Sequence, residues 1–276
     1  MGYNLDEYQE SSVKAEEKNA LIVAAPGSGK TTVIINRVNY LVKQKNILDK
    51  NIIVITFTKA AALNMKKRYF DKFNTTTAPF FGTFHGLFYK MLLKTGGNID
   101  IIDGGIVHKI VSNILNKYFD EVSEDKVKEA INNISLYKTS RLPLNEFKAS
   151  ISKEIFEEIL ETYEGYKKEN NKYDFDDLCI KVLELLKSNK NLCSAYQKLF
   201  KYILVDEFQD CDEMQIEFLK IINEGHENSL FAVGDEDQFI YSFRGSKPEY
   251  MVSFDEIFGD AKKYYLSVNY RSKQNI

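Results

Sequence analysis

Six short runs of apolar and β-branched residues recur along the sequence, and each is followed by a turn and a segment with a helical pattern. The runs are NALIVAAP from Asn19, NIIVITFT from Asn51, PFFGTFH from Pro79, YILVDE from Tyr202, SLFAVGD from Ser229 and YYLSV from Tyr264. Strands that are apolar on both faces are typical of a buried parallel sheet, in which helices form the crossovers. The sequence therefore predicts an α/β fold with a parallel sheet.

The middle of the chain has a different pattern. Between residues 97 and 195 it consists of charged amphipathic segments such as ISKEIFEEILETYEGYKKEN, with almost no strand-like runs. This pattern predicts helices, and the glycine-rich stretch TGGNIDIIDGG is the best candidate for a junction. We expect a discontinuous α/β domain formed by residues 1–96 and 196–276, with a helical insertion at 97–195.

The composition limits the broad class of the protein but does not decide its function. Hydrophobic residues make up 44% of the chain, which permits a sizeable core, and the net charge of −3 does not by itself indicate a nucleic-acid partner. No apolar run approaches the roughly 20 residues that span a bilayer, and no signal-peptide pattern is present. We expect no membrane association and a cytoplasmic location. The three cysteines lack metal-ligand spacing.

The stretch LIVAAPGSGKTT places an apolar strand directly before a glycine-rich turn and a helix. In this context the phosphate-loop pattern is meaningful, because backbone N–H groups and the helix N-terminus can surround phosphate oxygens. Lys30 would reach the β- and γ-phosphates, and the Thr31 hydroxyl would be a Mg²⁺ ligand. A chance turn of glycine and serine is the alternative. The predicted cofactor-binding residues of the loop are Ala25, Pro26, Gly27, Ser28, Gly29, Lys30, Thr31 and Thr32.

Another strand ends in the acidic sequence DEFQD, which begins at Asp206. In a chain with a phosphate loop, these acids supply what nucleotide hydrolysis still lacks: Asp206 to hold the magnesium ion and Glu207 to orient the attacking water. The strand ends at Lys30 and Asp206 would then lie side by side and share one magnesium-triphosphate. Helix capping is the alternative, and it suits Asp210 better.

A series of motifs in fixed order resembles the superfamily 1 DNA helicases of the UvrD, PcrA and Rep type. Besides the phosphate loop and DEFQD, the motifs are TFTKAAALNM, GTFHGLFYKML, YDFDDL, AVGDEDQFIYSFRGS and LSVNYRSKQNI. The resemblance spans Leu5 to Ile276 and implies a RecA-like P-loop NTPase domain interrupted by an all-α subdomain. Phe239 stands where serine is usual and Cys211 where threonine is usual, which leaves the subfamily open, including the helicase-nucleases.

The resemblance implies further contacts with ATP. Gln9 would read the adenine edge, and Tyr270 would stack on the base. Gln238 would contact the γ-phosphate, and Arg271 would neutralise charge on it. Arg37 would line the nucleotide pocket, although an arginine on a helix is more often solvated. The implied catalytic residues are Glu207, Gln238 and Arg271.

The resemblance also implies a surface for single-stranded DNA made of aromatic rings and hydroxyl groups. Bases can stack on aromatic side chains whatever their sequence, so such a surface needs no large basic excess. Core packing remains an alternative for Phe57 and Phe84. The implied DNA-binding residues are Phe57, Thr58, Thr83, Phe84, His85, Tyr241, Phe243 and Arg244.

The function implied by the resemblance is an ATP-dependent DNA helicase that translocates 3′ to 5′ along single-stranded DNA. It would act at junctions of single and double strands in repair, replication or recombination. Such helicases need a second RecA-like motor domain, which we expect beyond Ile276 in the native chain. The alternatives are a nucleotide-gated module that binds single strands without unwinding, and a small-molecule kinase of the phosphate-loop class.

Three acids in YDFDDL form a carboxylate cluster that could suggest a metal site. Aspartate is also favoured at helix starts, where its side chain accepts hydrogen bonds from backbone N–H groups. We therefore interpret Asp174, Asp176 and Asp177 as a helix start at the exit of the insertion.

Overall fold

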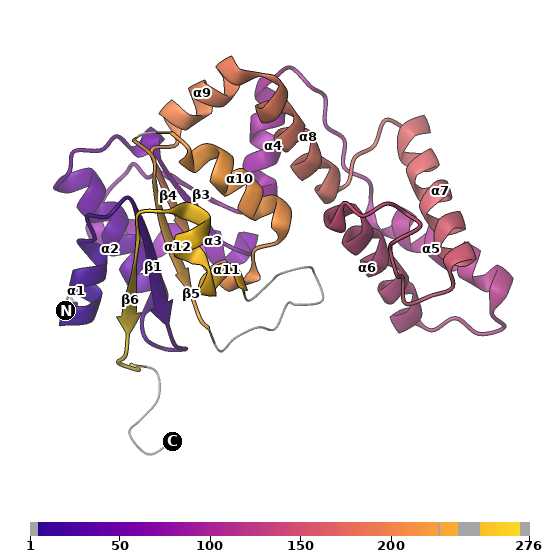
Figure 1. Ribbon diagram of the computed structural model, residues 1–276, viewed down its shortest axis with the longest axis horizontal. Coiled ribbons are helices and arrows are strands. Elements are labelled where there is room, and N and C mark those ends of the chain that lie inside the picture. The colour runs from indigo at the N-terminus through magenta and orange to yellow at the C-terminus, as the bar shows by residue number, and fades with distance from the viewer. Residues whose placement is uncertain (1–4, 226, 237–248, 271–276) are drawn as a thin grey trace.

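Six parallel strands form one sheet in the computed structural model, which describes residues 5–225, 227–236 and 249–270. The strand order is β3-β2-β4-β5-β1-β6 (Figure 1). The strands are β1 (Asn19–Ala24), β2 (Ile52–Ile55), β3 (Phe80–Gly82), β4 (Tyr202–Val205), β5 (Ser229–Gly234) and β6 (Ala261–Leu266). The predicted α/β fold with a parallel sheet is confirmed.

Both faces of the sheet are buried, as the continuous apolar strands predict. In β2 every residue is buried, and alternate side chains enter different cores: Ile53 and Ile55 on one face, Ile52 and Val54 on the other. Because successive side chains of a strand point to opposite faces, a strand covered on both sides must be apolar throughout. The sheet is therefore the middle layer of three.

Helices cover the two faces. The core on one face includes side chains from α1 (Glu7–Val13), α2 (Lys30–Lys43) and α3 (Lys59–Phe73). The other face is covered by α4 (Phe84–Lys94), α8 (Phe175–Ser188), α9 (Lys190–Leu199), α10 (Glu213–Asn223), α11 (Glu249–Val252) and α12 (Phe254–Phe258). Two single turns of 3-10 helix, η1 (Asp49–Asn51) and η2 (Phe208–Asp210), precede β2 and follow β4. No helix in the described part of the chain is both long and apolar enough to cross a bilayer.

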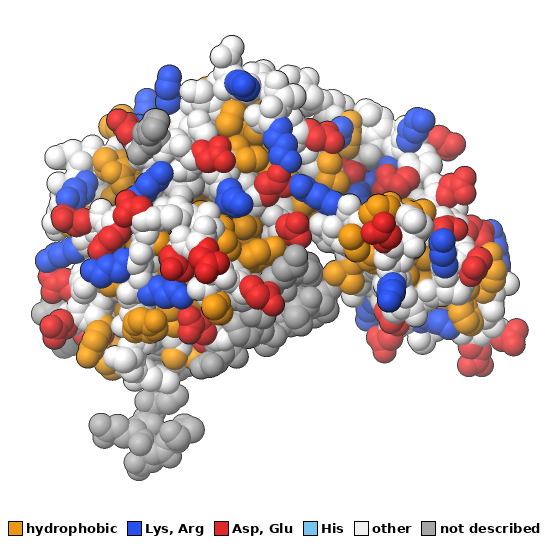
Figure 2. Space-filling view, in the orientation of Figure 1, with side chains coloured by type: hydrophobic (Ala, Val, Ile, Leu, Met, Phe, Trp, Pro, Cys, Tyr) orange, Lys and Arg blue, Asp and Glu red, His pale blue; other side chains and the backbone are white. Residues whose placement is uncertain are grey.

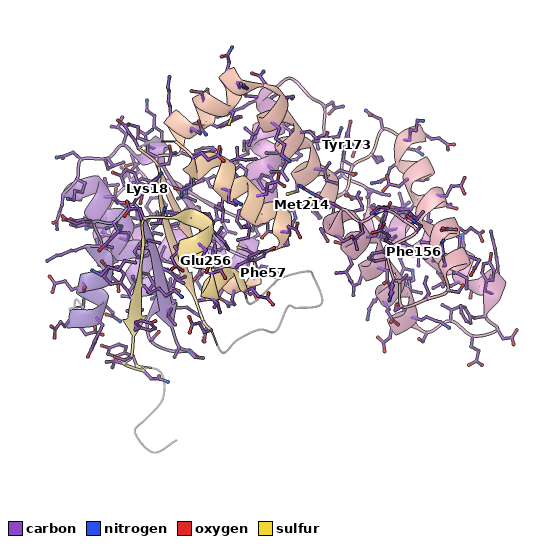
Figure 3. The ribbon with its side chains drawn as sticks, in the orientation of Figure 1. Lys18, Phe57, Phe156, Tyr173, Met214 and Glu256 are labelled. Carbon is purple, nitrogen blue, oxygen red and sulfur yellow. The ribbon has the colours of Figure 1, made fainter. Side chains whose placement is uncertain are left out.

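The remaining helices form a separate lobe, seen at the right of Figures 1 and 2. They are α5 (Gly104–Tyr118), α6 (Glu124–Ser140) and α7 (Lys153–Glu169). Their apolar faces enclose a core of their own around Phe156, which is labelled in Figure 3. Helices α8 and α9 pack instead with α4 and α10 over the sheet. On this packing we propose that the inserted unit is smaller than the expected 97–195 and comprises α5 to α7.

The two chain crossings into the insertion are hydrogen-bonded to each other. Ile101 and Tyr173 form an isolated parallel bridge, in which the Ile102 N–H donates to the Tyr173 carbonyl at 2.8 Å and the Tyr173 N–H to the Asp100 carbonyl at 2.9 Å. These two hydrogen bonds join the crossings directly to each other. The insertion is thus held at two points of the chain that are 72 residues apart in sequence.

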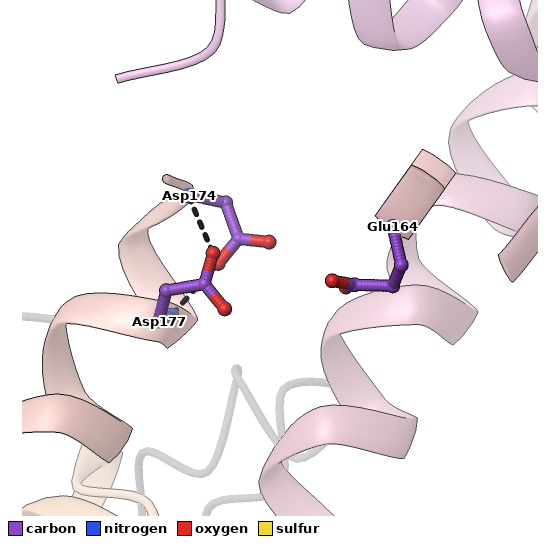
Figure 4. Close-up of side chains that lie close together, drawn as sticks. All are labelled: Glu164, Asp174 and Asp177. Carbon is purple, nitrogen blue, oxygen red and sulfur yellow. Dashed lines mark hydrogen bonds between the residues drawn. The ribbon is translucent and has the colours of Figure 1, made fainter. Parts of the chain in front are cut away.

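Beside this connection, buried lysines neutralise the carboxylates of YDFDDL. Asp174 is the N-cap of α8 and forms a capping box with Asp177, which confirms the interpretation as a helix start. Oxygens of these two residues and Glu164 lie within 4.8 Å of one another (Figure 4). The ammonium groups of Lys138 and Lys167 contact both aspartates at 2.5–2.7 Å. These lysines supply the positive charge that a metal ion would otherwise bring.

The charge cluster makes the acid dependence of stability predictable. Burial alone would raise the pKa of Asp174, but the charges of Lys138 and Lys167 hold that pKa well below its usual range. A depressed folded-state pKa contributes stability that is fully present above the unfolded pKa, about 4, and this contribution is lost progressively as pH falls from there through the folded-state pKa.

We predict that Lys138→Met lowers the free energy of unfolding by about 3 kcal/mol at pH 7, because it leaves buried carboxylates undercompensated. The loss should shrink as pH falls from about 4 toward the depressed folded-state pKa of Asp174, because the unfolded chain takes up a proton in this range that the folded protein does not. Lys153→Met removes an exposed ion pair with Glu157 and should change the free energy of unfolding by less than about 0.5 kcal/mol. Urea unfolding followed by circular dichroism measures both. Equal effects of the two variants would contradict the prediction.

Candidate active site

The loop after β1 has the backbone geometry of an anion-binding turn. Gly27 and Gly29 have φ values of 81° and 95°, in the left-handed region that glycine adopts without strain. Between them, the Ser28 N–H and Oγ both donate to the Ala25 carbonyl, at 3.1 and 2.7 Å. Helix α2 then begins at Lys30, and the first N–H groups of a helix have no acceptor within it. This arrangement presents backbone donors where a phosphate group can bind.

Two segments from opposite ends of the described chain lie on this loop. The Gln9 side-chain Nε2 donates to the Ser28 carbonyl at 3.0 Å, and Gln9 also completes a capping box with Asp6 at the start of α1. The Tyr270 N–H donates to the Gly27 carbonyl at 2.9 Å, and its hydroxyl donates to the Asp6 carboxylate. The two residues expected to contact adenine are therefore brought to the same loop, with the Tyr270 ring exposed.

The ends of three strands bring charged groups together at the carboxyl edge of the sheet. Lys30 follows β1, Glu207 follows β4 and Asp235 follows β5. The Lys30 Nζ lies 3.0 Å from Glu207 Oε2 and 4.0 Å from Asp235 Oδ2. Strand β5 separates β1 from β4, so the expected pair of strand ends are not immediate neighbours. The length of the lysine side chain spans the intervening strand.

Asp206 has a buried carboxylate oxygen without a hydrogen-bond partner among the described residues. Its N–H donates to the Ile55 carbonyl at 2.8 Å, which continues the ladder between β4 and β2. Its Oδ1 is buried and has no hydrogen-bond partner among the described residues. Burial, reinforced by the charge of Glu207, raises the pKa of Asp206 to about 7. A buried carboxylate oxygen of this kind fits a hard cation such as Mg²⁺, which takes oxygen ligands.

A cavity of about 530 Å³ opens beside these acids, between the sheet and the inserted helices. The residues lining it include Asp206 and Glu207 on one side and side chains of α5 and α6 on the other. His85 and Phe175 form an aromatic pair on its wall, with ring centroids 5.2 Å apart, and the Phe175 ring is 56% exposed. An exposed aromatic ring and the acids at the strand ends therefore line the same cavity.

Comparison with known proteins assigns the family. The UvrD/REP helicase N-terminal domain matches residues 5–259. The chain belongs to this family. It is 33% identical over 289 residues to the Bacillus subtilis protein YjcD, which carries a provisional name as an ATP-dependent DNA helicase. It is 31% identical over 284 residues to the ATP-dependent DNA helicase PcrA of Staphylococcus epidermidis and 30% identical over 279 residues to PcrA of Leuconostoc citreum.

These UvrD-family matches cover nearly all of the chain but only part of each relative. They include 97–100% of the present sequence and 37–39% of the relatives' own length. The chain therefore spans about two fifths of the length of the curated relatives that it matches.

Two residues expected to contact ligands lie in the protein interior. Arg37 is 4% exposed and its Nη1 donates to the carbonyls of Val13 and Ala15, at 2.8 and 2.7 Å, so it fastens the end of α1 to α2. Phe84 is 6% exposed and packs against Phe88 and Phe218. For Phe84 these contacts favour the packing alternative over a DNA role. For Arg37 they favour a structural role over the predicted nucleotide contact, and the solvated alternative is wrong because the side chain is buried.

Three other residues expected to contact DNA have different surroundings: two threonines cap helices, and one aromatic ring lines the cavity. The Thr58 and Thr83 hydroxyls accept hydrogen bonds from the N–H groups of Ala61 and Gly86, at the starts of α3 and α4. Phe57, labelled in Figure 3, is half-buried and lines the cavity. The predicted residues Gln238, Tyr241, Phe243, Arg244 and Arg271 lie outside the described residues.

The structure adds residues that the motif analysis did not single out. Phe175 lies within YDFDDL. An aromatic residue next to three acids is the sequence feature that could have indicated an exposed ring at this position. Arg68 lies one turn from the end of α3, and its Nη2 is 3.5 Å from the Thr32 hydroxyl near the phosphate loop. No sequence pattern indicated Arg68, because its position depends on how α3 packs beside α2.

We predict that Gly29→Ala raises the nucleotide Kd at least tenfold. An alanine at φ 95° is strained by about 1–2 kcal/mol, and its Cβ would lie 2.6 Å from Gln9 Nε2. Gly165→Ala is the control, because a Cβ there meets nothing within 4 Å and Gly165 does not line the cavity. Titration with a fluorescent ATP analogue measures both. An unchanged Kd for Gly29→Ala would show that the loop does not bind the phosphates.

Proposed function

We propose that this chain is the ATP-binding part of a DNA helicase that translocates along single-stranded DNA. The observation that carries the proposal is the contact of Lys30 with Glu207 at 3.0 Å, directly beside the buried and unpartnered Asp206 oxygen. Phosphate-binding and hydrolytic groups from separate strands thus meet at one point. The exposed Phe175 ring beside them provides a surface on which a base can stack.

The nucleotide chemistry follows from the charges. The phosphate loop would hold the triphosphate by its backbone N–H groups, and Asp206 and the Thr31 hydroxyl would hold Mg²⁺, which neutralises phosphate charge when bound. Phosphate oxygens would take over the Lys30 ammonium group from Glu207, because they carry more negative charge. Glu207 would then be free to accept a hydrogen bond from water and orient it toward the γ-phosphate. Hydrolysis would therefore depend on prior phosphate binding.

The finer assignments rest on the family resemblance. We propose 3′ to 5′ movement, action at junctions of single and double strands in repair, replication or recombination, and a second motor domain in the complete protein. Gln238 and Arg271 would act on the γ-phosphate, Gln9 and Tyr270 would hold the adenine, and Tyr241, Phe243, Arg244 and His85 would contact DNA. A cytoplasmic location also stays a prediction.

The nucleotide site has a direct test in the full-length protein. Glu207→Gln should leave the nucleotide Kd within about threefold while lowering DNA-stimulated ATP turnover by at least 100-fold, because the water loses its base. Lys30→Ala should instead weaken nucleotide binding. Glu157→Gln, an exposed change in the insertion, is the control. Normal turnover by Glu207→Gln, measured by phosphate release, would exclude Glu207 as the base.

The DNA surface is tested separately. Phe175→Ala should weaken binding of a fluorescent single-stranded oligonucleotide by about 1–3 kcal/mol, or roughly 5- to 150-fold, through the loss of a stacked base. Tyr118→Ala removes another exposed aromatic ring, at the far end of α5, and should change the affinity less than twofold. Fluorescence anisotropy measures both. If the unaltered protein binds no oligonucleotide, with or without an ATP analogue, the kinase alternative is favoured.

Unwinding distinguishes the helicase from its nearest alternative. A protein that binds DNA in a nucleotide-dependent manner but never separates strands would be a nucleotide-gated binding module. A strand-displacement assay with a 3′ single-stranded tail decides between the two.

A further inference from the structure

A buried glutamine joins the ends of two strands at the active site. Gln209 is 3% exposed, and both ends of its side-chain amide are used. Its Nε2 donates to Glu207 Oε2 at 2.9 Å, and its Oε1 accepts from the backbone N–H of Asp235 at 3.0 Å. One side chain therefore ties the carboxylate after β4 to the backbone after β5.

The backbone on both sides of the Gln209 amide has a conformation that leaves space for this side chain. Glu207 has φ 51° and ψ 48°, a left-handed conformation that is unfavourable for a residue with a side chain, and the turn η2 follows. The next residue, Phe208, is fully buried and contacts Phe254 at a centroid distance of 5.4 Å, which anchors the turn. On the other side, a Cβ at Gly234 would lie 2.8 Å from Gln209 Oε1. Glycine at this position leaves room for the amide.

Glu207 Oε2 has two donors, and only one of them is compatible with hydrolysis. The Lys30 Nζ lies 3.0 Å from this oxygen, but the proposed function needs Lys30 on the phosphates. When Lys30 moves, the hydrogen bond from Gln209 Nε2 remains. The neutral amide of Gln209 orients the carboxylate and leaves its negative charge in place. An ammonium group would orient the carboxylate and also neutralise that charge. The second oxygen of Glu207 is left to accept from water.

We infer that Gln209 is the positioning residue for Glu207 during hydrolysis. It holds the carboxylate after Lys30 has moved to the phosphates, and it fixes that carboxylate relative to the end of β5. The inference rests on the proposed function, in which Glu207 orients the attacking water. Gln209 acts through Glu207 and makes no contact with the nucleotide.

The test compares variants of the full-length protein that remove different parts of the link. Gln209→Met has a similar shape and makes neither hydrogen bond. Gln209→Glu keeps an acceptor for the Asp235 N–H but loses the donor to Glu207. Both should lower kcat for DNA-stimulated ATP hydrolysis at least tenfold, because a base displaced by about 1 Å loses up to 100-fold in rate. The nucleotide Kd should stay within about threefold.

A matched control separates positioning from general stability. Gln197 is a half-buried amide remote from the active site, and its Nε2 donates to the Ile221 carbonyl at 2.8 Å. Gln197→Glu should leave kcat unchanged. If the Gln209 variants lower kcat, nucleotide affinity and Tm together, Gln209 is merely structural and the inference is overturned. Unchanged kcat in Gln209→Met also overturns it. If Gln209→Met does not fold, Gln209→Glu alone carries the test, because it keeps the acceptor for the Asp235 N–H and removes only the donor to Glu207.

Two further measurements complete the test. In a Glu207→Gln background, single-turnover hydrolysis should show no additional loss from Gln209→Met, because residues that act through one group are not additive. An additional tenfold loss would overturn the inference. Crystal structures with Mg²⁺ and a non-hydrolysable ATP analogue should show the Glu207 carboxylate displaced in Gln209→Met. An unmoved Glu207 carboxylate in these structures would overturn the inference. A lack of ATP hydrolysis by the unaltered protein would instead contradict the proposed function, so the two failures are distinguishable.

Discussion

Burial of both faces of the parallel sheet determines where the functional groups can lie. Strands covered by helices on each side leave only their ends open to ligands, and in a parallel sheet all carboxyl ends share one edge. Lys30, Glu207 and Asp235 are collected at that edge because β1, β4 and β5 are consecutive neighbours in the order β4-β5-β1. Apolar side chains far from any ligand thus set the geometry of the charged site.

Two acidic clusters in the chain show how partners decide what a buried carboxylate does. Asp174 is held between Lys138 and Lys167, and the cluster fixes the start of α8 near the connection to the insertion. For Asp206, burial and the charge of Glu207 outweigh the charge of Lys30, and its pKa is raised to about 7. The first cluster is complete without a ligand. The second has a buried oxygen without a hydrogen-bond partner, which is the proposed place for a cation.

The cavity between the sheet and the inserted helices joins the charged strand ends to an aromatic surface. Helix α8 begins beside the double connection to the insertion, and this places Phe175 against His85 at the cavity wall. The same cavity reaches Asp206 and Glu207. A strand of DNA stacked on these rings would therefore lie close to the nucleotide site.

The sequence by itself determined the features that depend on residues adjacent to one another in the chain. The apolar runs predicted the parallel sheet, and the glycine-rich turn and the acids after β4 predicted which strand ends would bind a nucleotide, because strand, turn and helix form a local unit. Tertiary packing decided the rest. Arg37 and Phe84 are interior because of segments that pack on them from elsewhere in the chain. Gln209 bridges Glu207 to Asp235 only because β4 and β5 are paired, and no local pattern encodes that pairing.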